Sequence, residues 1–356
     1  MQRGRSDRTA GIQRKGERMK NGLHKRIALA ALLSSLLLAG SSCIYITNDA
    51  TARYERRESL SAPLEAGSTF SARTHDGSID VEGIDTTECK VEATIAGHAG
   101  TEEQAQELAE RVEVKLERAG DRLEVVINRP PTSGNAYTSV SLRAQVPGRT
   151  SLILATDDGA VHIAGITGKI NAESADGRIH AENVNGTVNL QTSDGEVVCT
   201  RAQADQLDLQ TNDGRIRLGD ITAKSITAHT SDGEISADHV RADSLTLRTS
   251  DGSIRCNGVA AQSIESHTGD GSIHIECATE APGAPTVDAT TSDGSITFVA
   301  PPGLSAAIEA RTNDGSIHTQ LPITVQGEVK KSLHGTIGAG EGRIRLRTEN
   351  GSITIR

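Results

Sequence analysis

Residues 248–254 read RTSDGSI. Close copies of this phrase recur along the chain, as TNDGRI at 211–216, TSDGEI at 230–235, TSDGSI at 291–296 and TNDGSI at 312–317. In tight turns, aspartate accepts hydrogen bonds from nearby backbone N–H groups, and glycine accepts positive φ. We therefore predict that Asp251 and Gly252 form a structural turn, and that the chain builds the same turn many times.

The glycine of this turn returns at a nearly constant interval. From Gly159 to Gly271 the spacing between successive turn glycines is 18 or 19 residues, and the later spacings are 23, 21, 20 and 16. A fixed period near 19 residues is the sequence signature of a solenoid, in which each repeat is one turn of the structure.

Apolar and polar residues alternate on both sides of the turn. After Gly252 the alternation runs through Ile254 and Cys256, and a second alternating run ends at Thr268. Alternation over about five residues, bounded by turn residues, indicates half-buried strands. The region from 151 to 356 contains no window with helical periodicity.

Each repeat thus offers two short strands with one apolar face, which a single repeat cannot bury. Stacking the repeats about 4.8 Å apart would pair equivalent strands in parallel and bury these faces in one thin core. The aromatic content of 1%, with no tryptophan, fits such thin layers. We predict an all-β fold, a single-chain β-solenoid (β-helix) with coils of about 19 residues and a small N-terminal β/α cap. A β-sandwich is the alternative, but it would not require such even spacing.

The region before the repeats has a different pattern. THDGSI at 74–79 is an early copy of the turn, and TEEQAQELAERV at 101–112 is a predicted helix with Thr101 and Gln104 as its capping box. Alternating strands are predicted at 112–116, 122–127 and 139–146. Because the end of a solenoid has to be covered, we predict that this segment is a cap. No comparable cap follows Arg356, so the last strand, GSITIR, is predicted to leave an exposed edge.

The N-terminal residues have the features of an export signal. Lys25 and Arg26 precede the apolar stretch 27–40, which is too short to span a membrane comfortably, and small residues follow it up to Cys43. Met19 is the predicted start, and LAGSSC resembles a bacterial lipobox, whose cysteine is lipidated; ordinary signal cleavage nearby and a retained anchor are the alternatives. The predicted organisation is an upstream extension (1–18), a signal peptide (19–42), a linker after the lipid anchor (43–60), a first coil with the β/α cap (61–150) and the solenoid repeats (151–356).

The charge of the chain restricts its partners. Without residues 1–42, which hold nine basic and two acidic residues, 28 basic and 45 acidic residues remain, a net charge of −17. Such a surface repels nucleic acid and anionic lipid headgroups. We therefore predict no nucleic-acid partner.

TSDGSI turns at this spacing, behind a short helix and a lipobox-like signal, resemble a bacterial family of β-strand-repeat proteins. That family is a domain of unknown function with the label "putative adhesin". The resemblance covers residues 60–356, and it implies a surface-exposed binding or scaffold protein. It brings no shared catalytic residues with it.

The aspartates of the turns also invite a metal hypothesis. Stacked coils would bring them into a row, where like charges repel unless hydrogen bonds or an ion such as Ca²⁺ neutralise them. The members of this calcium ladder would be Asp176, Asp194, Asp213, Asp232, Asp251 and Asp270. The glycine-rich nonapeptide of calcium-binding β-rolls is absent from the sequence. We therefore favour the purely structural interpretation of the turn and predict no resident metal.

Histidines and cysteines also recur in the repeats, but their spacing indicates neither a metal site nor a disulfide. His229 and His267 stand two coils apart and lack the converging ligands that zinc requires, so we predict that they lie on the surface. Cys199 and Cys256 share a repeat position three coils apart, roughly 14 Å, which exceeds the reach of a disulfide. We predict that these two, like Cys89 and Cys277, are small core residues.

The sequence favours binding over catalysis. It shows no nucleophile motif, phosphate loop or metal triad, so we predict no enzyme and no cofactor. We predict an exported, lipid-anchored adhesin or envelope scaffold, an outer-membrane or cell-surface lipoprotein whose partner is an envelope protein or a glycan. A structural module that self-associates through the open C-terminal edge is the first alternative, and a polysaccharide-active enzyme is the second.

Overall fold

The structure is a computed structural model that describes residues 52–132, 135–325 and 330–356. These residues form one continuous hydrogen-bonded sheet of 26 strands and one short helix, α1 (Glu102–Glu110). Among them, no helix is long and apolar enough to cross a membrane. The predicted signal peptide and Cys43 lie outside the described residues.

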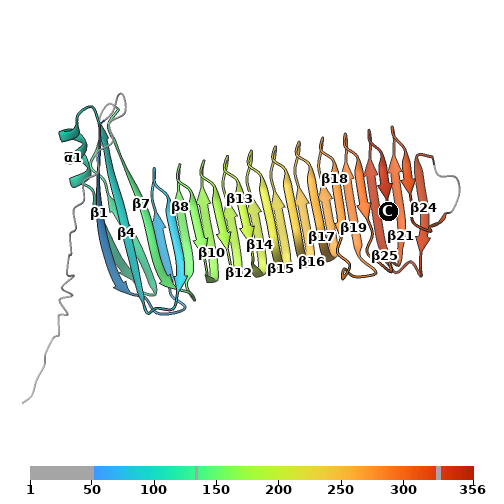
Figure 1. Ribbon diagram of the computed structural model, residues 1–356, viewed down its shortest axis with the longest axis horizontal. Helices are drawn as coiled ribbons and strands as arrows, with labels where there is room; N and C mark the ends of the chain where they lie inside the picture. Colours follow the sequence, from blue (N-terminus) through green and yellow to red (C-terminus); the bar gives the residue numbers. More distant parts are fainter. Residues whose placement is uncertain (1–51, 133–134, 326–329) are drawn as a thin grey trace, which may run out of the picture. The chain divides into compact units, whose positions relative to one another are not determined.

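The strands follow one another in a regular stack, shown in Figure 1. The first nine are β1 (Ala52–Pro63), β2 (Thr69–Arg73), β3 (Ile79–Ile84), β4 (Glu88–Ala99), β5 (Glu113–Ala119), β6 (Arg122–Asn128), β7 (Tyr137–Pro147), β8 (Ser151–Thr156) and β9 (Val161–Ala164). The central ones are β10 (Thr167–Ser174), β11 (Ile179–Glu182), β12 (Asn185–Gln191), β13 (Val197–Thr200), β14 (Gln203–Gln210), β15 (Ile216–His229), β16 (Ile235–Arg248) and β17 (Ile254–His267). The last ones are β18 (Ile273–Cys277), β19 (Thr286–Thr291), β20 (Ile296–Val299), β21 (Ala306–Thr312), β22 (Ile317–Thr319), β23 (Thr324–Val325), β24 (Ser332–Ile337), β25 (Gly342–Thr348) and β26 (Ile353–Ile355).

Each Asp-Gly turn joins two strands, and we call such a strand pair a coil. The strands before the turns pair in parallel and form the pre-turn sheet, which includes β8, β10, β12, β14, β19, β25 and β21. The strands after the turns form the parallel post-turn sheet, which includes β3, β9, β11, β13, β18, β20 and β26. The long strands β15, β16 and β17 run around the corner and belong to both. The predicted stack of parallel strands is confirmed, with a solenoid-like arrangement.

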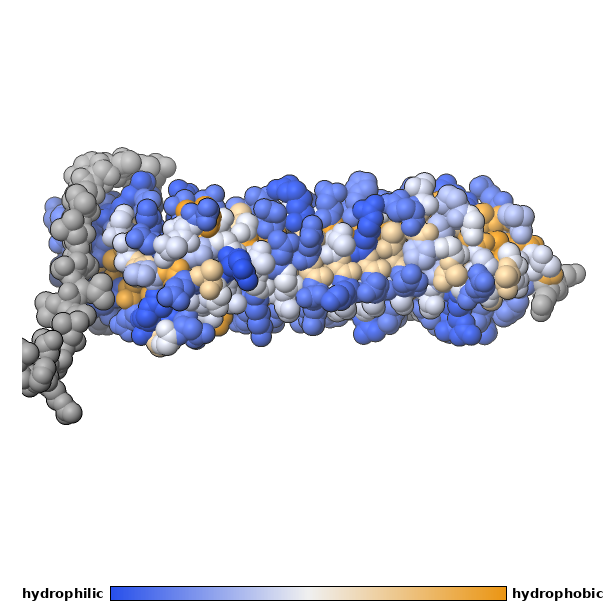
Figure 2. Space-filling view, turned by 90° about the horizontal axis from the view of Figure 1, so that it is seen from below, coloured by the Kyte–Doolittle hydropathy of each residue, from blue (hydrophilic) through white to orange (hydrophobic). Residues whose placement is uncertain are grey.

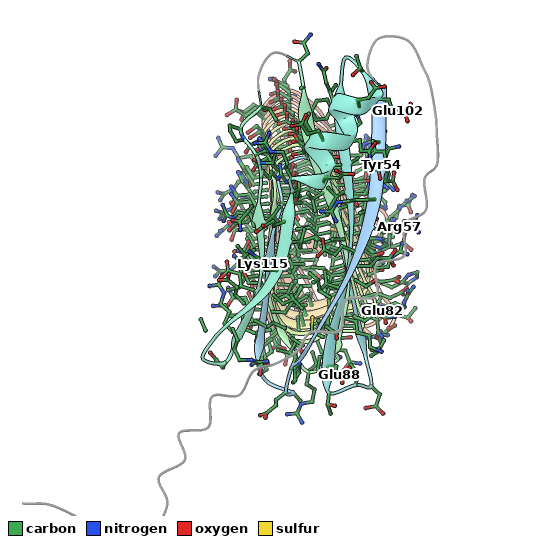
Figure 3. The ribbon with its side chains drawn as sticks, turned by 90° about the vertical axis from the view of Figure 1, so that its left-hand side faces the viewer. Tyr54, Arg57, Glu82, Glu88, Glu102 and Lys115 are labelled. Carbon is green, nitrogen blue, oxygen red and sulfur yellow. The ribbon has the colours of Figure 1, made fainter. Side chains whose placement is uncertain are left out.

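The core lies between these two sheets and is thin, as the composition suggests. Inward residues such as Ile216, Ile226 and Leu245 are completely buried, and they continue from coil to coil. Phe70 and Phe298 are the aromatic residues of this core, and both have no exposed surface. Figure 3 shows the filling of carbon-rich side chains between the sheets, with charged groups at the outside.

The corner opposite the Asp-Gly turns has its own repeated geometry. Asn183, Arg201, Asp220 and His239 occupy equivalent positions there and all have φ between 51° and 55°. A residue in this left-handed conformation lets the chain turn sharply between the two sheets. Figure 2 shows this edge from below, where a band of weakly hydrophobic residues runs between hydrophilic borders.

At the N-terminal end, stacking order and chain order differ. The coil made by β6 and β7 lies outside the coil made by β2 and β3, because β6 pairs with β2 and β7 pairs with β3. The antiparallel strands β5, β4 and β1 then complete the end, with β5 on β6, β4 on β7 and β1 on β4. Helix α1 begins after its N-cap Thr101, as predicted, and buries Ala105, Leu108 and Ala109.

Strand β1 corrects one predicted boundary. Residues 52–60, expected to be part of a linker, form most of this strand and pair with β4. The many charged residues of this segment obscure the alternating pattern of a strand, but in the structure their side chains form hydrogen bonds and ion pairs. Arg56 donates hydrogen bonds from Nε to the Ala109 carbonyl at 3.0 Å and from Nη2 to the Val112 carbonyl at 2.5 Å. Arg56 also forms an ion pair with Glu58 at 3.0 Å. Charged side chains are common on edge strands, and β1 is the edge strand here, so it does not need a fully apolar face.

The C-terminal end contradicts the predicted exposed edge. The last coil, β25 and β26, is inserted between two earlier coils: β25 pairs with β19 on one side and β21 on the other, and β26 pairs with β20 and β22. The segment 300–305 between β20 and β21 has six residues, whereas the segment 183–184 between β11 and β12 has two. The longer connection gives the chain the length to pass over the position that the last coil later fills. The final strand is therefore an interior strand.

A cap also covers this end, although none was predicted. Strand β24 pairs with β21 in antiparallel orientation, and the two-residue strand β23 pairs with β24. An antiparallel strand interrupts the parallel repeat and cannot be extended in the same register. The alternative of self-assembly through an open edge at GSITIR is therefore wrong in its premise, because that strand already has two neighbours.

Candidate functional site

The Asp-Gly turns line one edge of the stack and are joined by a ladder of buried hydroxyl groups. The Thr230 side chain is completely buried, its Oγ1 donates toward the Gly214 carbonyl at 3.0 Å, and it accepts a hydrogen bond from the Gly233 N–H at 3.2 Å. The same position, three residues before the turn glycine, holds Thr156, Ser174, Thr192, Thr211, Thr230, Thr249, Thr268, Thr291, Thr348 and Thr312. Each hydroxyl thus connects its own turn to the turn of the neighbouring coil.

Close stacking explains the turn glycines. A Cβ on Gly233 would lie 1.9 Å from the Gly214 carbonyl oxygen, and a Cβ on Gly252 would lie 1.8 Å from that of Gly233. The predicted reason for glycine was wrong, because neither residue is among those with positive φ. Glycine is required here because the backbone of the neighbouring coil occupies the place of a side chain.

The aspartates contribute their backbone rather than their carboxylates. The N–H groups of Ser250 and Asp251 both donate to the Ser231 carbonyl, at 2.8 and 2.9 Å. In the described turns from 176 to 270, no aspartate carboxylate accepts a hydrogen bond from a backbone N–H, contrary to our expectation; the threonine hydroxyl accepts the local one instead. The Asp251 side chain is exposed.

These exposed carboxylates form the predicted row along the edge. The row contains Asp158, Asp176, Asp194, Asp213, Asp232, Asp251 and Asp270, each one coil from the next. In the part of the chain that the structure describes, no group of three or more His, Cys, Asp or Glu residues is arranged to hold a metal ion. The row supplies one carboxylate per coil, which gives a line of charge rather than a coordination shell.

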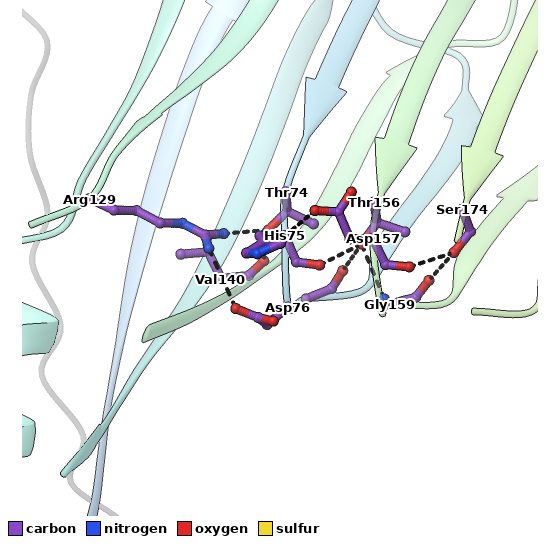
Figure 4. A network of polar contacts seen from close by, with 10 residues as sticks. Thr74, His75, Asp76, Arg129, Val140, Thr156, Asp157, Gly159 and Ser174 are labelled. Carbon is purple, nitrogen blue, oxygen red and sulfur yellow. Dashed lines mark hydrogen bonds and ion pairs between the residues drawn. The ribbon is translucent and has the colours of Figure 1, made fainter. Parts of the chain in front are cut away.

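The N-terminal end of the hydroxyl ladder is closed by an arginine, as Figure 4 shows. Thr74 donates from Oγ1 to the Val140 carbonyl at 2.7 Å, and Arg129 donates from Nη2 to the same hydroxyl at 2.9 Å. Arg129 also lies 3.7 Å from the Asp76 carboxylate, and His75 contacts Asp157 in the next turn. At the outer coil, made by β6 and β7, a charged side chain thus takes the place of the next hydroxyl in the ladder.

The hydroxyl ladder gives a direct stability prediction. Replacing Thr230 with valine keeps the shape but removes the hydroxyl, which leaves the Gly233 N–H without its acceptor in the core. We expect a loss of about 2 kcal/mol in the free energy of unfolding, the usual cost of a buried unsatisfied group. Urea denaturation of the two proteins measures this difference. Thr230→Ser is the control, because Ser174 fills the same position, and it should cost only about 1 kcal/mol for the lost methyl group. Equal losses for valine and serine would contradict a role for the hydroxyl.

The cysteines are placed as the sequence predicts. Cys89, Cys199, Cys256 and Cys277 are free and buried, and none of the four forms a disulfide. Burial raises the pKa of the Cys89, Cys199 and Cys277 thiols to about 12. A thiol with so high a pKa is not a nucleophile at neutral pH. These side chains therefore serve as small core residues.

The histidines lie on the outer surfaces. His229 and His267 are exposed, as predicted, and Arg248 lies between them in the pre-turn sheet. On the post-turn sheet, the rings of His162 and His180 are 5.2 Å apart between centroids, and His162 lies 3.2 Å from the Asp80 carboxylate. Burial and the neighbouring His162 lower the pKa of His180. The neutral form of the His180 ring is therefore favoured over the protonated form.

Charged residues on the post-turn sheet form pairs between coils. Glu196 contacts Arg178 at 2.7 Å and Arg217 at 3.1 Å, and Glu234 contacts Arg255 at 2.5 Å. Opposite charges on neighbouring coils help to set the register of the strands. Arg215, Arg217, Glu234 and Arg255 also line a shallow hollow on this face.

These observations describe a stacked-strand protein with a repeated turn, and a family model matches it over residues 138–214 and 185–356. The chain belongs to the Toastrack DUF4097 family. Its predicted relationship to a family of β-strand-repeat proteins of unknown function is thereby confirmed. The predicted lipoprotein signal lies outside the matched residues. Among curated proteins, none matches this Toastrack chain.

Several solved structures resemble the Toastrack chain in fold. A "putative adhesin" from Parabacteroides merdae is 12% identical, with a TM-score of 0.46, and the match covers 84% of this chain and 96% of that one. A "putative adhesin" from Parabacteroides distasonis is 11% identical, with a TM-score of 0.41 and coverage of 85% and 97%. A "putative lipid binding protein" from the same species is 13% identical, with a TM-score of 0.40 and coverage of 84% and 96%. At this level of similarity, they say nothing about what this chain binds.

Proposed function

We propose that this Toastrack protein is an exported, lipid-anchored, non-catalytic β-solenoid that presents its two sheets for adhesion or as a scaffold in the cell envelope. One observation carries the proposal. The inward positions of both sheets are filled by completely buried aliphatic residues, so the groups available for recognition are the outward rows. These rows repeat at the strand spacing of about 4.8 Å and suit extended partners better than small molecules.

The proposed anchor is a lipid on Cys43, which lies outside the described residues. Residues 44–51 separate this cysteine from the start of β1 at Ala52. Eight residues span at most about 28 Å, so an anchored protein would hold its N-terminal end near the membrane surface. A cysteine with several acyl chains gives stable anchoring. The sheets would then be presented to the envelope or the cell exterior.

The anchor can be tested by replacing Cys43 with serine. We expect the full chain to lose incorporation of labelled fatty acid and to move from the membrane fraction to the soluble fraction. Cys277→Ala is the matched control, because this buried cysteine lies far from the signal in sequence, and it should retain both the label and the membrane fraction. Unchanged labelling of the Cys43→Ser chain would refute the lipid anchor.

The binding role is tested separately, by screening the full chain against envelope glycans and envelope proteins. We expect saturable binding of at least one extended partner, and no turnover of a glycan during prolonged incubation. Hydrolysis of a glycan would refute a non-catalytic role and favour the polysaccharide-active alternative. The absence of any binding partner in both panels would refute adhesion.

A further inference from the structure

The pre-turn sheet gathers four arginines at its C-terminal end, on a chain that is otherwise acidic. Arg343, Arg345 and Arg347 alternate along β25 and face outward, and Arg311 on the neighbouring β21 pairs in register with Arg347. We call these four residues the arginine patch. Strands β25 and β21 lie side by side near the right-hand end of Figure 1. Two adjacent strands therefore carry a local positive charge where the chain without residues 1–42 has a net charge of −17.

Part of this patch is explained by the inserted coil. Arg345 contacts Asp288 on one flanking strand at 3.1 Å and Glu309 on the other at 3.5 Å, and Arg347 contacts Glu309 at 3.0 Å. The hydrogen bond from Arg347 lowers the pKa of Glu309, and Arg345 adds to the effect. Opposite charges on neighbouring strands help to set register. Arg345 and Arg347 thus hold β25 in place between its neighbours.

The other two arginines have no such role. Arg311 and Arg343 are exposed, and within the described residues the side chain of neither forms a hydrogen bond or an ion pair. Arg311 lies directly opposite Arg347, and like charges at opposed positions of neighbouring strands are unfavourable. Asp288 and Glu309, the carboxylates that the patch contacts, are bound by Arg345 and Arg347. The fold therefore leaves two guanidinium groups with free donors and an uncompensated charge.

The spacing of these groups points to a ligand with more than one anionic group. Arg343 and Arg347 are four residues apart on one strand, about 13 Å, and Arg347 and Arg311 are about 5 Å apart across two strands. A guanidinium donates two parallel hydrogen bonds to phosphate, and it is more weakly hydrated than an ammonium. An extended chain with phosphates at intervals can reach both ends of the patch.

We propose that the arginine patch binds a phosphate-bearing glycan, with Arg311 and Arg343 as the contacting residues. This inference rests on the proposed binding role and names a ligand class for it. A membrane surface fits less well, because a bilayer would face the acidic surroundings of the patch as well as the patch itself, and like charges would repel. A single phosphorylated chain meets only the patch.

Inorganic tripolyphosphate serves as the probe, titrated calorimetrically into the full chain at low salt. We expect binding that weakens as the salt concentration rises, and that weakens about tenfold for each of Arg311→Gln and Arg343→Gln, the loss for one charge-assisted hydrogen bond. Arg215→Gln is the matched control, and it should bind as the parent does, because Arg215 is exposed beside the post-turn sheet and its side chain has no partner among the described residues. Arg343→Lys should recover only part of the affinity, because lysine lacks the planar fork.

The possible outcomes separate this inference from the proposed function. Equal weakening by Arg215→Gln, or no effect of Arg311→Gln and Arg343→Gln, would overturn the patch as a phosphate site. Binding to phosphatidylglycerol vesicles without binding to tripolyphosphate would overturn it in favour of a membrane surface. If the double variant still binds a phosphate-free glycan from the screen, the adhesion proposal stands while the patch loses its role. Melting temperatures equal to that of the parent show that the variants are folded.

Discussion

Replacing Gly233 with alanine should lower the free energy of unfolding by about 3 kcal/mol, at the upper end of the cost of overpacking a core. The new Cβ would lie 1.9 Å from the Gly214 carbonyl oxygen and 2.6 Å from its carbon. Both are backbone atoms of a central coil and cannot rotate away, so the two coils must move apart. Separation would stretch the hydroxyl contacts of Thr230 as well. Urea denaturation of the parent and variant measures the loss.

Gly219, on the strand β15 that precedes this turn, provides the matched control. A Cβ there would meet only the Thr200 methyl group, at 3.5 Å, and its φ lies outside the left-handed region. Gly219→Ala should therefore change the free energy of unfolding by less than about 0.5 kcal/mol, as a typical surface substitution does. If the two alanine variants were equally stable, the close approach of successive turns would not be the reason for glycine.

Removing the inserted coil, residues 342–356, should unfold the C-terminal end of the stack. Ile344, Leu346, Ile353 and Ile355 are completely buried, and burial of four such side chains contributes roughly 6–12 kcal/mol. Both neighbouring coils lose a partner at once. We expect amide hydrogens of β19, β21 and β24 to lose protection from exchange, while those of β15 to β17 remain protected, because each coil contacts only its neighbours.

Hydrogen exchange read out by mass spectrometry resolves these strands. Thr354→Ala is the control, because this residue lies on the outer side of β26 and should leave the exchange pattern unchanged. Protection of β21 that survives the truncation would show that its coil stacks directly on β19 and β20. The insertion would then be dispensable for order at this end.

The repeated pattern predicted the stacked strands, the buried positions and the short helix, since all three follow from periodicity and local capping. The reason for the turn glycines could not be predicted from the sequence of a single turn, because the cause is a contact between two coils. The contact that requires Gly233 comes from Gly214 in another coil. The threonine three residues before each glycine was visible in the sequence, but its hydrogen bonds appear only when the coils are superposed.

The insertion of the last coil could not be predicted from the period, because a period assigns each repeat to the next place in the stack. One signal was present in the sequence, since β25 carries arginines where its flanking strands carry Asp288 and Glu309. The length of the segment 300–305 is not a second signal, because the segment 278–285 has eight residues and joins adjacent coils. The row of turn aspartates was predicted correctly in position, but the expected hydrogen bonds to their carboxylates are not made in the described turns.

The two ends of this stack are each completed by chain that is out of sequence order, and this has a consequence for how such proteins change length. If a coil among β9 to β17 were duplicated or deleted, the coils on either side would still be equivalent to each other. The threonine hydroxyl of one turn would again donate to the glycine carbonyl of the neighbouring turn. A duplication or deletion next to β2 or β25 would instead disrupt pairings between strands that are not consecutive in the chain, such as β2 with β6 and β21 with β25. Relatives of different length should therefore differ by whole coils from the middle, while their terminal segments keep the same pairing.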